Sequence, residues 1–356
     1  MNAMTALGSM PKWLPRLVGP GVVLAVAALA LAYGSQLRHL AVPVLAEPAA
    51  APSARPASLE ELSLALEPLV PAGARVAALA ESERGVLAIG LFDRGVALWR
   101  RGEAKPTPVP EIDGRRRFVT GLGWRKERLF VGTYGGVLEV DSSGRLCGIQ
   151  LDGTAVESLL VTPERILAGT SRGLFARTDG LFEELPLVTP DGEPLRAISL
   201  ASSRGTLWIG TSRGVYSVAA GERTAVWHPL VFGRPPATTN VALALAIAKE
   251  GAIAGTDDGG LARVGQDDVE ALRFEDARAN GVNPGAATQV AGCAVFGTRG
   301  GVVIGSPELE SARRFAAALD VTAVHAGSRL FVGTASGQVL ALDFDRLRCP
   351  ERTAAR

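Results

Sequence analysis

The sequence has 356 residues, of which 47% are hydrophobic and 21% charged, and its formal net charge is +1. This length exceeds the roughly 250–300 residues at which a single simple core stops growing, so we expect several domains or one repeat architecture. The small net charge gives no bulk attraction for nucleic acid, and no nucleic-acid partner is expected. Three scattered cysteines, Cys147, Cys293 and Cys349, do not form a disulfide framework or a metal motif, although a single pair among them is left open.

An uncharged, apolar segment at residues 17–34 follows a short N-terminal stretch that contains Lys12 and Arg16. Its length is at the lower limit for a helix that spans a bilayer, and the preceding basic residues orient the N-terminus toward the cytoplasm. We interpret residues 1–16 as a cytoplasmic segment and residues 17–34 as a transmembrane helix that acts as a signal anchor. The alternatives are a cleaved signal peptide and a buried helix.

Either an anchor or a cleaved signal places the rest of the chain outside the cytoplasm. We therefore expect a membrane-anchored protein in the periplasm or at the cell surface, or a secreted protein if the segment is cleaved. Residues 35–57 are rich in proline and alanine, a composition that favours an extended, semi-rigid linker.

One short phrase recurs seven times after this linker. Each copy has an apolar run, a glycine, a small polar turn and a second apolar run, as in "LWIGTSRGVYSV" at 207–218. Two β-rich runs on either side of a glycine-containing turn predict a β-hairpin. We expect the first glycine to lie where another backbone approaches closely. These first glycines recur at intervals of 36 to 45 residues and are Gly90, Gly132, Gly169, Gly210, Gly255, Gly297 and Gly333.

Each repeat also has an apolar run before the hairpin and a weaker one after it. Four strands with their turns fill about 40 residues, which is the length of a four-stranded propeller blade. The sequence therefore predicts an all-β, seven-bladed β-propeller of four-stranded blades over residues 58–346, followed by a tail at 347–356. The phrase "EELSL" at 60–64 is similar to the outer-strand segments, so we expect the N-terminal strand to complete the last blade.

The core of the phrase resembles the two-component-regulator propeller repeat. The best match is "LWIGTSRGV" at 207–215, with weaker matches at 129–137, 166–174 and 330–339. In that family, such repeats form the extracytoplasmic, ligand-sensing regions of membrane-bound sensor kinases. The resemblance thus implies a propeller outside the cytoplasm, here without a kinase domain.

Residue patterns typical of a catalytic or metal site are not found. The histidines lie apart: His39 flanks the apolar segment, His228 is in a predicted outer strand, and His325 is in a predicted inner strand that borders the central channel. No metal-ligand spacing or nucleophile motif occurs, and adjacent carboxylates in turns more often point to solvent than across a cleft. We expect no enzyme activity, no cofactor and no metal.

The turns between the second and third strands of the blades are predicted to emerge on one face, together with the loops between blades. Long loops are expected there at 188–194, 231–240 and 275–288, the last of which contains Asn283. Four of the seven turns carry arginine, which holds anions by bidentate hydrogen bonds; the alternative is that these arginines are solvated turn residues. The predicted binding residues are Arg94, Tyr134, Arg172, Arg213, Arg234, Asp257, Asp258, Arg278 and Arg299.

These features predict an exported, membrane-tethered binding or scaffolding propeller that recognises a protein or an anionic ligand through this face. One alternative is a propeller enzyme, such as a hydrolase, a lyase or a quinone-dependent oxidoreductase, that uses the central channel. A second alternative is the extracytoplasmic sensor subunit of a two-protein signalling system.

Overall fold

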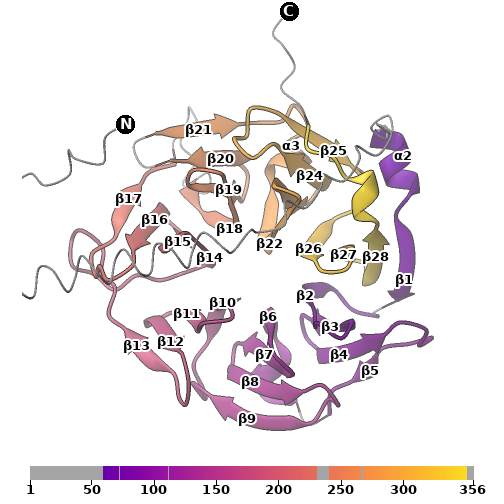
Figure 1. Cartoon of the computed structure of the whole chain (residues 1–356), viewed down its shortest axis with the longest axis horizontal. Helices are drawn as coiled ribbons and strands as arrows, with labels where there is room; N and C mark the ends of the chain where they lie inside the picture. Colours follow the sequence, from indigo (N-terminus) through magenta and orange to yellow (C-terminus); the bar gives the residue numbers. More distant parts are fainter. Residues whose placement is uncertain (1–58, 72, 111, 231–239, 266–267, 351–356) are drawn as a thin grey trace, which may run out of the picture. The chain divides into compact units, whose positions relative to one another are not determined.

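The computed structural model describes residues 59–71, 73–110, 112–230, 240–265 and 268–350. They form seven antiparallel, four-stranded sheets arranged around a central axis (Figure 1). The prediction of an all-β, seven-bladed propeller is therefore confirmed. The predicted membrane segment and linker lie outside the described residues. Among the helices that the structure describes, none has the length and apolar character needed to cross a membrane.

In every blade the first strand lies nearest the axis and the fourth lies at the rim (Figure 1). The strands of blades 1 and 2 are β2 (Val76–Glu81), β3 (Val86–Leu91), β4 (Gly95–Arg100), β5 (Thr107–Pro108), β6 (Val119–Arg125), β7 (Arg128–Thr133), β8 (Gly136–Asp141) and β9 (Leu146–Gln150). Those of blades 3 and 4 are β10 (Val156–Val161), β11 (Ile166–Thr170), β12 (Gly173–Arg177), β13 (Glu183–Leu185), β14 (Ser199–Ser203), β15 (Thr206–Thr211), β16 (Gly214–Ala219) and β17 (Val226–His228). Those of blades 5 and 6 are β18 (Ala242–Ile247), β19 (Ala252–Thr256), β20 (Leu261–Val264), β21 (Val269–Leu272), β22 (Val282–Val290), β23 (Cys293–Thr298), β24 (Gly301–Gly305) and β25 (Ala312–Phe315). Blade 7 consists of β26 (Val321–Ala326), β27 (Leu330–Thr334), β28 (Gln338–Leu342) and β1 (Glu67–Pro71).

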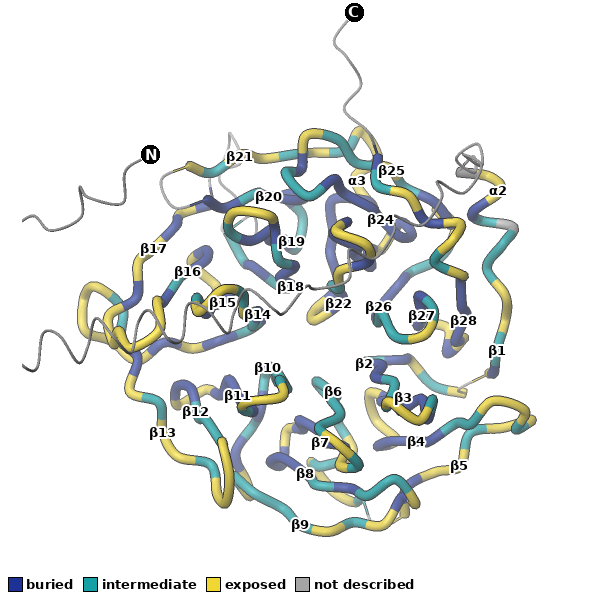
Figure 2. Tube along the Cα trace, viewed as in Figure 1, coloured by how far each residue is buried: buried dark blue, intermediate teal, exposed yellow. Residues whose placement is uncertain are grey.

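The second strand of each blade is buried over most of its length because the neighbouring blades cover both faces of its sheet. All six residues of β3 and of β23 are buried. Strands covered on both faces read as continuous apolar runs, which explains the composition of the repeat. Figure 2 shows this burial in the middle strands and greater exposure toward the rim. The core is thus a series of apolar layers between adjacent blades.

The recurring phrase performs the same two structural tasks in nearly every blade. Its first glycine faces the innermost strand of the next blade: a Cβ at Gly210 would lie 2.5 Å from the carbonyl oxygen of Ala242. The threonine that follows closes the turn, since Thr211 Oγ1 donates to the Gly214 carbonyl at 3.0 Å. The equivalent bonds are made by Thr133, Thr170, Thr256, Thr298 and Thr334. The expected close approach at the first glycine is confirmed.

The two ends of the propeller join in blade 7. Strand β1 pairs antiparallel with β28, with Glu67 opposite Ala341 and Val70 opposite Val339, so the predicted closure by an N-terminal strand is confirmed. The segment predicted to be that strand, however, is the helix α2 (Leu59–Leu64). Leu62 of α2 is buried in the apolar cluster of blades 6 and 7, and acidic residues occupy its first turn, where they suit the positive end of a helix.

The chain after the last strand returns from blade 7 to blade 6. It passes through the short 3-10 helix η5 (Phe344–Arg346), and Cys349 then forms a disulfide with Cys293 at the start of β23. The hydroxyl of Ser311 donates to the Pro350 carbonyl at 3.0 Å. The pairing that the sequence left open is therefore Cys293–Cys349, while Cys147 is a free, exposed thiol.

The prediction of a long loop at 275–288 is wrong in part. It contains the short helix α3 (Ala277–Asn280) and more than half of β22. A bulge shifts the register of β22 between Val282 and Ala287, so Pro284 and Gly285 stand outside the ladder. A proline and a glycine at a bulge are tolerated in a strand, although they read as a loop in the sequence.

Candidate functional site

The strands of every blade alternate in direction, which defines two faces of the propeller. One face, here called the loop face, carries the turns between second and third strands and the connections between blades. The predicted binding residues that the structure describes all lie on turns or connections of this face. Arg234 lies outside the described residues.

Three of the predicted residues come together between blades 5 and 6. Arg299 forms an ion pair with Asp257, and Arg278 Nη2 donates to the Arg299 carbonyl at 2.6 Å. Asp258 lies half-buried in the same turn as Asp257. The charges of this cluster largely satisfy one another, and the cluster holds the turns of two neighbouring blades together.

The other predicted arginines lie on separate turns. Arg172 Nη2 donates to Thr154 Oγ1 at 2.6 Å, whereas Arg94 and Arg213 are exposed on blades 1 and 4. Within the described part of the chain, Arg278 and Arg299 are the only two of these arginines that contact each other through a hydrogen bond. The arginines therefore present several separated positive groups on the loop face.

A cavity of about 570 Å³ opens on the loop face near the axis; we call it the mouth pocket. It is bordered by residues from blades 1, 2, 3, 4, 6 and 7. Five of these residues also border a second cavity of about 350 Å³ among the innermost strands. The mouth pocket is lined by Arg75, Ala77, Phe92, Arg115, Val119, Thr120, Tyr134, Ala155, Glu157, Ile198, Pro284, Gly285 and Thr322.

Aromatic side chains form one wall of the mouth pocket. Phe92 follows β3 in blade 1, and Tyr134 follows β7 in blade 2. Phe118 is the last residue of the connection between these two blades. The Phe92 and Phe118 rings meet edge to face at 5.6 Å, and the Phe118 and Tyr134 rings stack at 6.0 Å. Phe92 is 40% exposed and Tyr134 37%, although both are large and apolar. Exposed aromatic rings at a concave site are typical of ligand-binding surfaces.

The repeat pattern predicted Tyr134 as a binding residue but not Phe92. Both residues stand two positions after the first glycine of their repeats, Gly132 and Gly90. The other five repeats have serine, aspartate, arginine or alanine at that position. An aromatic residue at one register position in two neighbouring blades was the signal that could have found this wall.

The charged groups around the mouth pocket leave it positive. The Glu157 carboxylate is held by Arg196, whose Nε lies 3.1 and 3.0 Å from its two oxygens. The guanidinium of Arg115 has no hydrogen bond or ion pair within the described part of the chain. Arg75 Nη2 lies 3.5 Å from the neutral amide oxygen of Asn283.

Asn283 itself is buried in β22 and not exposed on a loop as expected. Its Nδ2 donates to the Val321 carbonyl at 2.8 Å and to Asp320 Oδ1 at 3.0 Å. The Nδ2 of Asn283 thus holds the innermost strand of blade 6 against blade 7, and its Oδ1 faces Arg75. Asp320 does not line the mouth pocket.

The two histidines that the structure describes lie on different strands. His325 borders the inner cavity, and its Nε2 accepts a hydrogen bond from the Glu81 backbone N–H at 2.9 Å. Burial lowers the pKa of His325 to about 4, so the ring is neutral at pH 7. His228 is on the outer strand β17, 2.8 Å from Ser217 Oγ. Among the described residues, no three His, Cys, Asp or Glu side chains converge as metal ligands would.

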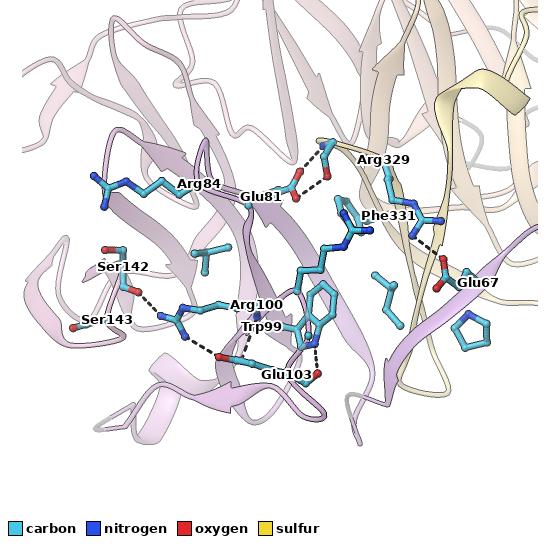
Figure 3. A pocket seen from close by; sticks show the side chains of 17 residues that line it. Glu67, Glu81, Arg84, Trp99, Arg100, Glu103, Ser142, Ser143, Arg329 and Phe331 are labelled. Carbon is cyan, nitrogen blue, oxygen red and sulfur yellow. Dashed lines mark hydrogen bonds and ion pairs between the residues drawn. The ribbon is translucent and has the colours of Figure 1, made fainter.

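A larger cavity of about 1030 Å³ lies on the opposite face, between blades 7 and 1. Figure 3 shows Arg100, Glu103 and Ser142 at one side of it, Arg329 and Glu67 at the other, and Trp99 between them. Most of its charged groups are already paired. Arg329 contacts Glu67 at 2.8 Å, Arg100 donates to the Ser142 carbonyl at 2.8 Å, and Ser328 Oγ donates to Glu81 at 2.8 Å. The Ser328–Glu81 bond joins the last blade to the first, the Arg100–Ser142 bond joins blades 1 and 2, and the Arg329–Glu67 pair lies within blade 7.

Solved structures share this architecture at low sequence identity. The extracellular domain of a protein assigned as a one-component system of B. thetaiotaomicron has a TM-score of 0.62 at 12% identity, over 78% of this chain and 40% of that one. The extracellular domain of a hybrid two-component system from the same organism has a TM-score of 0.61 at 15% identity, over 76% and 39%. A catalytically inactive virginiamycin B lyase from Staphylococcus aureus, with quinupristin, has a TM-score of 0.60 at 12% identity, over 78% and 97%.

The chain is therefore a seven-bladed β-propeller of the architecture found in these extracellular domains and in a lyase. It spans about 40% of the length of the two signalling domains. The predicted resemblance to the propellers of two-component regulators is confirmed at the level of the fold. No protein-family model and no curated protein matches the sequence.

Proposed function

We propose that this protein is an exported, membrane-tethered binding propeller that recognises a ligand or a protein partner through its loop face. The observation that carries the proposal is the mouth pocket, where exposed aromatic rings and two arginines surround one concavity on the predicted face. The exposed arginines of the hairpin turns, Arg94 and Arg213, extend a positive surface around it.

Two observations support a place outside the cytoplasm. The apolar segment at residues 17–34 has basic residues before it, as expected for an N-terminal anchor. The disulfide between Cys293 and Cys349 is the kind of bond that persists in oxidising compartments and is rare in the cytosol. The two features are independent, since the disulfide joins residues at the other end of the chain.

Affinity capture tests recognition by the loop face. The full chain carries a C-terminal tag, is purified in detergent, and is compared with a variant in which Arg94, Arg172, Arg213 and Arg299 are replaced by alanine. A matched control replaces Arg84 and Arg101, which border the cavity on the opposite face. We expect the loop-face variant to lose specific partners that the control retains. Equal capture by all three proteins would contradict recognition of a partner by the turn arginines of the loop face.

Membrane attachment is tested separately. An uncleaved anchor keeps the chain in the membrane fraction after alkaline washing, and protease added to intact spheroplasts releases the propeller without detergent. A cleaved signal instead leaves the intact propeller in the soluble extracytoplasmic fraction. Protection of the propeller from external protease would contradict the proposed orientation.

A sensor subunit is a second candidate, favoured by the fold shared with the extracellular domains of signalling proteins. In this case the captured partner is a membrane protein with a cytoplasmic kinase. Identification of captured proteins in the experiment above distinguishes the two candidates.

A further inference from the structure

We infer that the mouth pocket binds a small organic anion with a flat, apolar ring, that is, an aromatic carboxylate. This inference rests on the proposed function and names the chemical class of ligand for the same face. It follows from the shape, the charge and the hydrogen-bonding capacity of the pocket.

The walls of the pocket select an apolar body. Phe92, Tyr134, Val119, Ile198 and Pro284 border a volume of about 570 Å³, which is in the usual range for a small-molecule site. The exposed rings of Phe92 and Tyr134 are held by Phe118 between them, so they offer a preformed surface for a second flat ring. Aromatic pairs prefer offset stacking or edge-to-face contact, and both geometries are open to a planar ligand here.

The charge of the pocket selects an anion. Arg75 and Arg115 both border it, and Arg115 makes no ion pair within the described residues. The lining carboxylate, Glu157, is held at two points by Arg196 and does not offset them. A guanidinium binds the planar carboxylate group through two parallel hydrogen bonds, which places the carboxylate at the rim and the ring against the aromatic wall.

The remaining polar groups disfavour a neutral, polyhydroxylated ligand. The hydroxyl of Thr120 already donates to the Val156 carbonyl at 2.9 Å, and that of Thr322 donates to the Val76 carbonyl at 2.5 Å. Both bonds link neighbouring blades and are part of the fold. The guanidinium groups and the Tyr134 hydroxyl are therefore the principal side-chain donors that the pocket offers to a ligand.

The test uses 2-naphthoate, with 2-naphthamide as an uncharged ligand of the same shape, and measures binding to the full chain in detergent by calorimetry. Arg115→Gln removes the charge at an exposed position. Arg117→Gln is the matched control, because Arg117 is exposed on the same 3-10 helix, η3 (Gly114–Arg117), and does not border the pocket.

We expect saturable binding of 2-naphthoate that is at least about tenfold tighter than that of the amide, since hydrogen bonds to charged groups are the stronger ones. Arg115→Gln should weaken naphthoate binding about tenfold and leave amide binding unchanged. Arg117→Gln should change neither. Equal affinity for acid and amide, an equal loss in both variants, or no saturable binding would overturn the inference.

This result is separable from the proposed function. If naphthoate fails to bind while the loop-face variant still loses its partners, the ligand class is wrong and the loop face remains a binding surface. If naphthoate binds as expected while partner capture is unaffected, the ligand site stands and recognition of a macromolecule by the turn arginines is wrong.

Discussion

The hydroxyl of Thr322, on the innermost strand of blade 7, donates to the backbone carbonyl of Val76, on the innermost strand of blade 1, at 2.5 Å and across 246 residues of sequence. The same kind of bond joins other neighbouring blades. A side chain of the innermost strand donates to a backbone carbonyl at or just before the start of the next innermost strand in the pairs Thr120–Val156, Ser158–Ala197, Ser199–Ala242 and Asn283–Val321. The joint between the two ends of the chain therefore uses the contact that links blades adjacent in sequence.

Replacing Thr322 by valine should weaken this joint. The substitution keeps the volume of the side chain but leaves the Val76 carbonyl without this donor in a buried site. We expect the free energy of unfolding to fall by about 1–2 kcal/mol in urea titrations. Thr107→Val, at an exposed position of β5, is the control and should change it by less than about 0.5 kcal/mol. Equal stability of the two variants would show that the bond contributes nothing measurable.

Replacing Gly210 by alanine should disturb the packing between blades 4 and 5 and lower the free energy of unfolding. A Cβ there would lie 2.1 Å from Ser199 Oγ and 2.5 Å from the Ala242 carbonyl oxygen, both in or at the innermost strands. We expect a loss of about 1–3 kcal/mol, the range for overpacked interiors. Gly148→Ala is the control, because no neighbouring atom lies within 4 Å of its Cβ position. A thermal melt in which the two variants coincide would contradict this account of the repeat glycine.

The disulfide should stabilise the closed propeller. It spans 56 residues, and the loop entropy removed from the unfolded chain corresponds to about 4 kcal/mol, although measured values are often nearer 2–4 kcal/mol. Cys349→Ser should lower the unfolding free energy by this amount, and Cys147→Ser should not. Reductant should destabilise the wild type but not the Cys349→Ser variant. A reductant effect of the same size on both proteins would exclude the disulfide as its cause.

His325 should make stability depend on pH. Its pKa is about 4 in the folded protein and about 6.5 in an unfolded chain, so between these values the unfolded state binds more protons. The contribution of His325 to the free energy of unfolding is fully present above pH 6.5 and is lost as the pH decreases toward 4. It amounts to up to about 3 kcal/mol over this window.

The variant His325→Gln tests this dependence, because the glutamine oxygen can still accept the Glu81 backbone N–H. Denaturant titrations at pH 7, 5.5 and 4.5 should show a shallower decline for the variant than for the wild type. Parallel declines would assign the pH dependence to other groups.

The repeat alone was sufficient to predict the blades. Apolar runs, glycines and their period of about 40 residues are local properties, and six of the seven blades form by pairing of strands adjacent in sequence. Closure was also predictable, because seven repeats leave one strand to be supplied by the N-terminal end. The position of that strand was misassigned by a few residues, since α2 has an apolar face that packs on the rim and resembles a strand in composition.

The candidate site depended on the tertiary structure. The sequence determined which residues occupy the turns of the loop face, and thereby Tyr134 and the arginines. Whether those side chains meet depends on the radial position of each turn and on the unequal lengths of the connections between blades. The connection between blades 1 and 2, for example, places Arg115 and Phe118 beside Tyr134. The bulge in β22 places Pro284 and Gly285 outside the ladder. Asn283 of the same strand contacts Arg75, which is 208 residues away in the sequence. A periodic sequence specifies the fold because every blade solves the same packing problem, whereas the mouth pocket arises from the differences between blades and exists only once the ring is closed.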